Sequence, residues 1–68
     1  MNEDNLNMEI RKFLKKVGIT SQRMIENHIH EADKKGTIKA GDEIELKMTL
    51  SIENFKSSNI IDGKIMIE

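Results

Sequence analysis

The two histidines are the side chains best suited to metal binding or proton transfer in this sequence. His28 and His30 are two positions apart, so on an α-helix they point about 160° away from each other. Two ligands on one helix need the i, i+4 spacing that puts both on the same side. His30 shares an arc only with Glu26 and Asp33, which is a weak divalent site at most. We therefore predict no metal site, and we interpret His28 as a half-buried packing residue.

The remaining polar residues offer no catalytic group. The glycines stand singly along the chain, and none belongs to a phosphate-binding loop. The serines and threonines fall where helix capping or the polar side of a strand accounts for them. Asp42, Glu43 and Glu45 are close in sequence but lack the ligand spacing of a calcium loop. We expect a protein that is not an enzyme and that binds no cofactor.

Length and composition favour one small domain covering residues 1–68. A second core would need about 50 further residues, and the absence of cysteine excludes disulfides, so a second subunit is the favoured source of extra stability. No apolar run approaches the roughly 18 residues of a membrane span. The start, Met-Asn-Glu-Asp, is acidic where a signal peptide is basic. A soluble, cytoplasmic protein is expected.

The stretch around which the fold is expected to form is the segment from Ile44 to Ile52. It alternates apolar and polar residues without a break, which predicts a strand with one apolar face. Such a strand needs partner strands and a cover over that face. We predict an antiparallel sheet of two or three strands at about 43–53 and 58–68.

Two helices are predicted to supply the cover, at about 4–17 and 21–35. The first has a core-facing stripe, begins at Asp4 or Asn5 and stops at Gly18. The second begins at Thr20 or Ser21 and ends before Gly36. The stripe of the first helix consists of Leu6, Ile10, Phe13, Leu14 and Val17. The narrower stripe of the second helix consists of Met24, Ile25, Ile29 and Ala32.

The C-terminal segment permits two interpretations. Asp62-Gly63 is a strong hairpin signal and would split the segment into two strands, with Ile60, Ile65 and Ile67 on one face. One long strand would instead place Ile61 inside and make Asp62-Gly63 a bulge. Both versions leave Met66 outside. Ile60 and Met66 are therefore candidate contacts with a protein partner or a second copy of the chain. The alternative is that they are ordinary exposed apolar residues, which many protein surfaces carry singly.

A run of basic residues supports an alternative function. From Arg11 to Arg23 there are five basic residues and no acidic one, although the formal charge of the chain is −1. Helix, glycine turn and second helix are similar to a helix-turn-helix domain that binds DNA. Leu14 and Asn27 depart from that pattern, because those sites are usually small and apolar respectively. The candidate nucleic-acid contacts are Arg11, Lys12, Lys15, Lys16, Gln22 and Arg23.

Over nearly its whole length the sequence resembles a family of short bacterial proteins of unknown function. The resemblance is carried by the run Arg11–Arg23, by Lys47-Met-Thr-Leu50 and by Ile61-Asp-Gly63. The family has a glutamate where this chain has Met24. A glutamate at that position would complete a capping box that begins at Ser21. The family pattern therefore favours Ser21 over Thr20 as the cap of the second predicted helix. The resemblance implies no activity and no functional residues. We expect an α+β, non-catalytic interaction module that associates with itself through its sheet.

Overall fold

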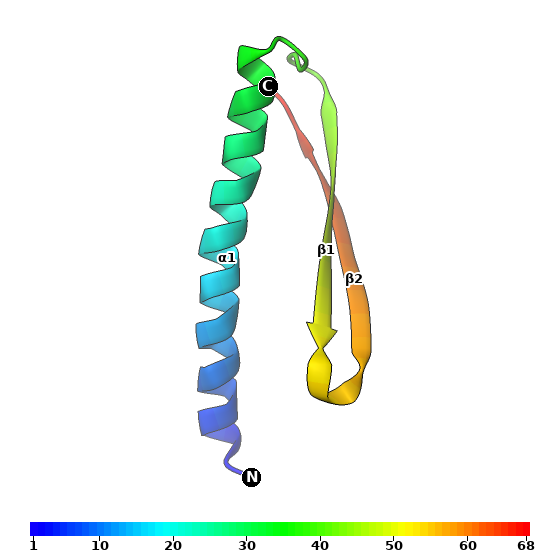
Figure 1. Cartoon of the computed structure of the whole chain (residues 1–68). Coiled ribbons are helices and arrows are strands. Elements are labelled where there is room, and N and C mark those ends of the chain that lie inside the picture. The colour runs from blue at the N-terminus through cyan, green and yellow to red at the C-terminus, as the bar shows by residue number, and fades with distance from the viewer. The chain divides into compact units, whose positions relative to one another are not determined.

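The computed structural model describes all residues from 1 to 68 and has one long helix followed by a two-stranded antiparallel hairpin (Figure 1). The predicted α+β class is confirmed. The chain divides into two compact units, Met1–Lys35 and Gly36–Glu68. The elements are the helix α1, Glu3–Lys34; the strand β1, Glu43–Ile52; a short 3₁₀ turn, η1, Glu53–Phe55; and the strand β2, Ser57–Met66.

The prediction of two helices is wrong, because α1 runs without interruption for 32 residues. Gly18, Thr20 and Ser21, which were expected to end one helix and cap the next, all lie inside it. A glycine in a helix interior costs about 1 kcal/mol relative to alanine. A break would instead leave the last four C=O groups and the first four N–H groups of the two pieces without helical partners. The continuous helix avoids that larger cost.

The start of α1 also differs from the prediction. The N-cap is Asn2, whose side-chain Oδ1 accepts a hydrogen bond of 3.0 Å from the backbone N–H of Asn5. Asp4 and Asn5, the expected caps, lie within the helix. Glu3 and Asp4 occupy the first turn, where negative charge interacts favourably with the helix dipole.

The end of the helix is where the sequence placed it. Lys35 is the C-cap, and its backbone N–H donates to the Glu31 carbonyl at 3.1 Å. The next residue, Gly36, has a φ of +71°, a left-handed conformation that glycine adopts without steric cost. The helix therefore stops at a residue that favours a turn.

Both strands were predicted to within two residues, and the interpretation of the tail as one long strand is correct. The register pairs Ile44 with Ile65 and Met48 with Ile61, and it continues through Lys47–Asp62 without a bulge. The predicted hairpin at Asp62-Gly63 and the predicted bulge there are both wrong. The reversal occurs at Glu53–Lys56, a loop of four residues between paired Ile52 and Ser57, where the predicted strands 43–53 and 58–68 required a turn.

The hairpin loop depends on one strained residue. Lys56 has φ +50° and ψ +39°, the left-handed region that costs a residue with a Cβ about 1 kcal/mol or more. Its backbone N–H donates to the Glu53 carbonyl at 3.3 Å. Loops of four residues built around a tight turn are a common way to join two antiparallel strands.

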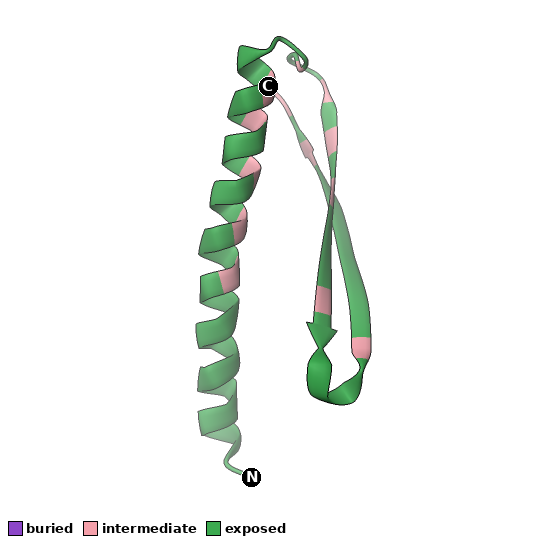
Figure 2. Cartoon of the chain, in the orientation of Figure 1, coloured by how far each residue is buried: buried purple, intermediate pink, exposed green.

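Neither unit has a buried core. All residues are either exposed or intermediate in exposure (Figure 2). The most covered helix positions are in the C-terminal half of α1, and the most covered strand positions lie on one face of the hairpin. In α1 the residues of intermediate exposure are Val17, Ser21, Ile25, Ile29 and Ala32. In the two strands they are Ile44, Leu46, Leu50, Ser57 and Ile65.

Candidate interaction surfaces

One face of the hairpin is mainly apolar, with Asn59 and Ser57 as its polar members at the end near the loop. Directly opposed residues of an antiparallel pair point to the same side, and successive residues alternate between sides. The register therefore gathers seven apolar side chains, which we call the apolar hairpin face: Ile44, Leu46, Met48, Leu50, Ile52, Ile61 and Ile65. This is the face expected from the alternation between Ile44 and Ile52, now extended by β2.

The apolar hairpin face contains one gap. Gly63 lies opposite Leu46, and a Cβ added at Gly63 would meet no heavy atom within 4 Å. A shallow hollow at the middle of the hairpin is lined by Glu45, Leu46, Lys47, Asp62, Gly63 and Lys64, and the four charged residues among these belong to the opposite face of the hairpin. A glycine at this point lets another backbone or a bulky side chain approach the sheet closely.

The opposite face of the hairpin is mainly charged. Lys64 Nζ lies 3.4 Å from Glu43 Oε1, and Lys47 pairs with Asp62 in the register. Ile60 and Met66, the predicted partner contacts, interrupt this polar face and are 64% and 62% exposed. The structure thus places both on one side of β2, six positions apart in sequence, where they do not form a continuous patch.

The apolar side of α1 forms a second surface. Because the helix is continuous, the two predicted stripes join, and Val17 and Met24 lie on the same side, two turns apart. Leu6, Ile10 and Phe13 are 40%, 46% and 57% exposed. We call this surface the helix stripe, and its members are Leu6, Ile10, Phe13, Leu14, Val17, Met24 and Ile25.

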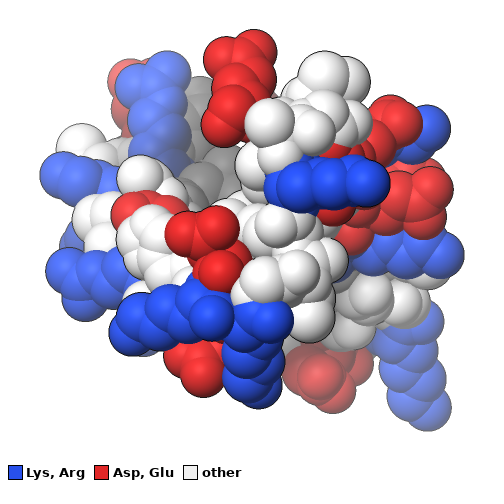
Figure 3. Space-filling view, turned by 90° about the horizontal axis from the view of Figure 1, so that it is seen from above, with Lys and Arg blue, Asp and Glu red and all other residues white.

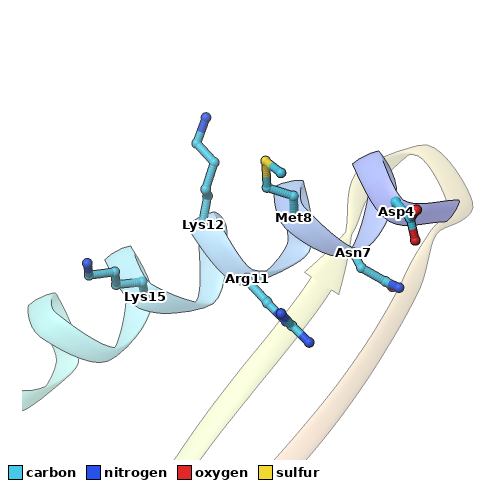
Figure 4. Close-up of a pocket in the computed structure, with 6 residues that line it drawn as sticks. All are labelled: Asp4, Asn7, Met8, Arg11, Lys12 and Lys15. Carbon is cyan, nitrogen blue, oxygen red and sulfur yellow. The ribbon is translucent and has the colours of Figure 1, made fainter. Parts of the chain in front are cut away.

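The opposite side of α1 is basic. The six predicted nucleic-acid contacts all lie on this one helix, within about 140° of arc at 100° per residue. A shallow hollow along its first turns is lined by Asp4, Asn7, Met8, Arg11, Lys12 and Lys15. In Figure 4 the side chains of Lys12 and Arg11 point away from each other. These side chains do not converge on a common ligand position.

The helix-turn-helix comparison loses its geometric basis. That motif needs a turn before a recognition helix, and residues 18–21 are helical in this structure. Gln22 and Arg23 are therefore mid-helix residues and not the first residues of a second helix. Acidic and basic side chains both occur on the face seen in Figure 3. Just before the basic stretch, Glu9 Oε1 lies 3.9 Å from Lys12 Nζ.

The structure assembles no group of three or more His, Cys, Asp or Glu side chains that could hold a metal ion. His28 and His30 lie on α1, on different sides of the helix. No helix combines the length and the apolar character that crossing a membrane requires.

The continuous helix stripe is the surface feature that the sequence interpretation missed. Its signal was present, because Val17 and Met24 are seven residues apart and seven residues return to the same side after two turns. The two stripes were in phase across Gly18. Two separate helices would not require their apolar stripes to lie at the same angle around one common axis. The shared angle therefore indicated one continuous helix.

Comparison with known proteins agrees with the resemblance noted from the sequence. Neither a curated protein nor a solved structure matches the chain. A family model, described as a family of unknown function (DUF6494), matches residues 1–68. The chain therefore belongs to DUF6494, a family of unknown function.

Proposed function

We propose that this protein is a non-catalytic interaction module whose core is completed by association with another copy of the chain. The observation that carries this proposal is that seven apolar residues share the apolar hairpin face while no residue of the chain is buried. An isolated two-stranded hairpin is marginally stable at best in water and needs a helix or further strands against its apolar face.

The apolar hairpin face and the helix stripe are the surfaces that gain most from being covered. We infer that a helix of a second copy of the chain lies over the apolar hairpin face, with Gly63 allowing close approach above Leu46. Self-association through the sheet would then use the open strand edges. Ile60 and Met66, on the other face of β2, are the remaining candidate contacts.

Sedimentation and unfolding together test the proposal. We expect a dimer or higher oligomer that dissociates on dilution, with a free energy of unfolding that rises with protein concentration across a hundredfold range. A chain that stays monomeric throughout, with cooperative unfolding independent of concentration, would contradict self-association.

Nucleic-acid binding is the second candidate. The observation in its favour is that Arg11, Lys12, Lys15, Lys16 and Arg23 share one side of a continuous helix. Such a helix would bind phosphates through its length and not through a helix-turn-helix. Titration of random duplex DNA at about 50 mM and 200 mM salt separates the two candidates, because phosphate contacts would make binding fall steeply with salt.

A further inference from the structure

The outer edge of β2 has no neighbouring strand. The sheet consists of two strands only (Figure 1), so each strand pairs on one side. Natural proteins commonly protect an open edge with proline, with a bulge or with a row of charged residues. The chain has no proline, β2 pairs with β1 without a bulge, and its only charged residues are Asp62 and Lys64. The edge is therefore suited to pairing with a further strand.

The backbone of β2 presents alternate residues to this open edge. Just past the strand, the Ile67 N–H donates to the Asp42 carbonyl at 2.8 Å, and the Ile67 carbonyl accepts from the Gly41 N–H at 2.7 Å. Both polar groups of Ile67 are thus used on the side of β1. Because this direction alternates along an antiparallel strand, the N–H and C=O groups of the even-numbered residues point outward: Ile60, Asp62, Lys64 and Met66.

One register of β2 against β2 of a second copy pairs opposite charges. In an antiparallel pair the outward-pointing residues must face each other, so the twofold axis falls on a residue. With the axis at Gly63, Asp62 of each copy lies opposite Lys64 of the other. Moving the axis by one residue sets Asp62 opposite Asp62 or Lys64 opposite Lys64, which is destabilising. Moving it by two residues sets Asp62 opposite Ile60 or Glu68.

The same register pairs apolar side chains on both faces. Ile61 lies opposite Ile65 of the second copy on the apolar hairpin face, and Ile60 lies opposite Met66 of the second copy on the other face. In the single chain Ile60, Ile61 and Met66 are 64%, 64% and 62% exposed, whereas no apolar residue of β1 is more than 39% exposed. The two residues that interrupt the polar face of one chain therefore become cross-strand partners between two chains.

The first strand extends the charge pairing across four strands. Lys47 lies opposite Asp62, and Glu45 lies opposite Lys64, within each hairpin. In a sheet with the strand order β1, β2, β2, β1, one row across the polar face therefore consists of Lys47, Asp62, Lys64 and Glu45, and the twofold axis repeats that row. The signs alternate along each row, which favours this partner strand and this register.

The outer edge of β1 does not single out one register with itself. An axis at Leu46 sets Glu45 opposite Lys47, but an axis at Met48 also opposes no like charges, since Lys47 then faces Thr49. Neither register joins apolar residues on the polar face, because the residues of β1 on that face are all polar. The edge of β2 is therefore the more specific of the two.

We propose that two copies of this chain pair antiparallel along the outer edges of their β2 strands, with Gly63 of each copy at the twofold axis, and so form one four-stranded sheet. The seven apolar residues of each hairpin then share one face. This inference deepens the proposed function and rests on it, because it names the edge and the register through which the chain associates.

The absence of cysteine from the chain makes disulfide crosslinking a direct test. Gly63→Cys alone should form a covalent dimer under mild oxidation, because directly opposed residues of this kind have Cα atoms about 4.5 Å apart. Within one chain an added Cβ at Gly63 meets no heavy atom within 4 Å. Ile61→Cys and Ile65→Cys should each stay monomeric alone, since each lies about 13 Å along the strand from its own copy. An equimolar mixture of these two variants should crosslink.

Leu46→Cys is the matched control. Leu46 lies opposite Gly63 on the same face, but on β1. In the proposed sheet the two copies of Leu46 are three strand spacings apart, or about 14 Å, so Leu46→Cys should stay monomeric on denaturing gels.

The other outcomes overturn the proposal in distinguishable ways. Crosslinking of Ile61→Cys alone would indicate parallel strands, and crosslinking of Leu46→Cys would place the contact at the edge of β1. A dimer in sedimentation without a crosslink at Gly63 or in the mixture would place the contact elsewhere in the chain and leave the proposed function standing. An unmodified chain that stays monomeric at every concentration would overturn both proposals.

Charge reversal gives a measurement that needs no oxidation. Asp62→Lys and Lys64→Asp should each raise the dissociation constant of the dimer about tenfold or more, because like charges replace opposite charges at two symmetric positions. An equimolar mixture of the two variants should restore association, because each variant supplies the charge that the other has lost.

Glu45→Lys is the control for charge reversal. It sets a lysine opposite Lys64 within its own chain, as Asp62→Lys does opposite Lys47, but it lies one strand away from the proposed contact. Its dissociation constant should stay within about threefold of that of the unmodified chain. Circular dichroism at high concentration shows whether each variant is folded. Equal dissociation constants for Asp62→Lys and Glu45→Lys, or a mixture that fails to associate, would contradict the proposed register.

Discussion

Met48 and Ile61 lie directly opposite each other in the register of β1 and β2, on the apolar hairpin face. They are 39% and 64% exposed. Opposed side chains in antiparallel strands have Cβ atoms about 5 Å apart and stabilise the pairing. A two-stranded sheet cannot cover both from above, so this pair contributes fully only when a further layer packs on it. The stability of the hairpin is therefore tied to whatever covers this face.

Substitution of Leu50 tests that link. If the apolar hairpin face is covered in the native assembly, Leu50→Ala should lower the free energy of unfolding by about 2–3 kcal/mol, the usual cost of truncating a packed leucine. Thr49→Ala, one position away on the polar face, should change it by less than about 0.5 kcal/mol. Urea unfolding at one fixed protein concentration measures both. Equally small effects would mean that the face remains in water.

The loop at Lys56 permits a prediction of stabilisation. Lys56 has a φ of +50°, which glycine adopts without a steric penalty. Lys56→Gly should raise the free energy of unfolding by about 0.5–1 kcal/mol. Lys47→Gly is the control: it lies inside β1 and should be destabilising, since glycine weakens a strand. Thermal unfolding of the three proteins gives the comparison, and a loss of stability in Lys56→Gly would contradict the left-handed loop.

The N-cap of α1 predicts a local effect. Asn2→Ala removes the Oδ1 that accepts from the Asn5 N–H at 3.0 Å, and loss of such a cap costs about 1 kcal/mol. Asn5→Ala keeps the backbone donor and should have little effect. Hydrogen exchange of the first-turn amides measures the local opening. Faster exchange in Asn5→Ala than in Asn2→Ala would instead favour the cap position that was expected from the sequence.

The sheet was largely predictable from the sequence because period-2 alternation between Ile44 and Ile52 has one structural interpretation. The second strand was ambiguous because Asp62-Gly63 is a turn signal only when flanking strands can pair with each other. Here β1 is long enough to pair with all of Ser57–Met66. Pairing along ten residues outweighs a local turn preference, so Asp62 and Gly63 remain in the strand.

The helical part was less predictable because local signals opposed a longer pattern. Gly18, followed by Ile-Thr-Ser, looks like a stop and a new cap, and each residue alone favours that interpretation. The apolar pattern from Leu6 to Ile25 stays in phase through Gly18, which only one helix explains. The candidate interaction surfaces could be predicted only as residue sets, because the sequence pattern shows which residues share an apolar face and not what covers that face.

Gly18→Ala distinguishes the continuous helix from the broken one by the sign of its effect. At Gly18 an added Cβ would meet no heavy atom within 4 Å, and φ is not positive. Alanine should therefore stabilise the chain by about 1 kcal/mol, its advantage over glycine in a helix interior. If Gly18 ended a helix in the left-handed conformation, alanine would destabilise it by a similar amount. Gly36→Ala is the control: because φ of Gly36 is +71°, this substitution should be destabilising. Thermal unfolding monitored by circular dichroism at 222 nm decides between the continuous and the broken helix. A continuous α1 also predicts a slight gain in the helical signal of Gly18→Ala before unfolding.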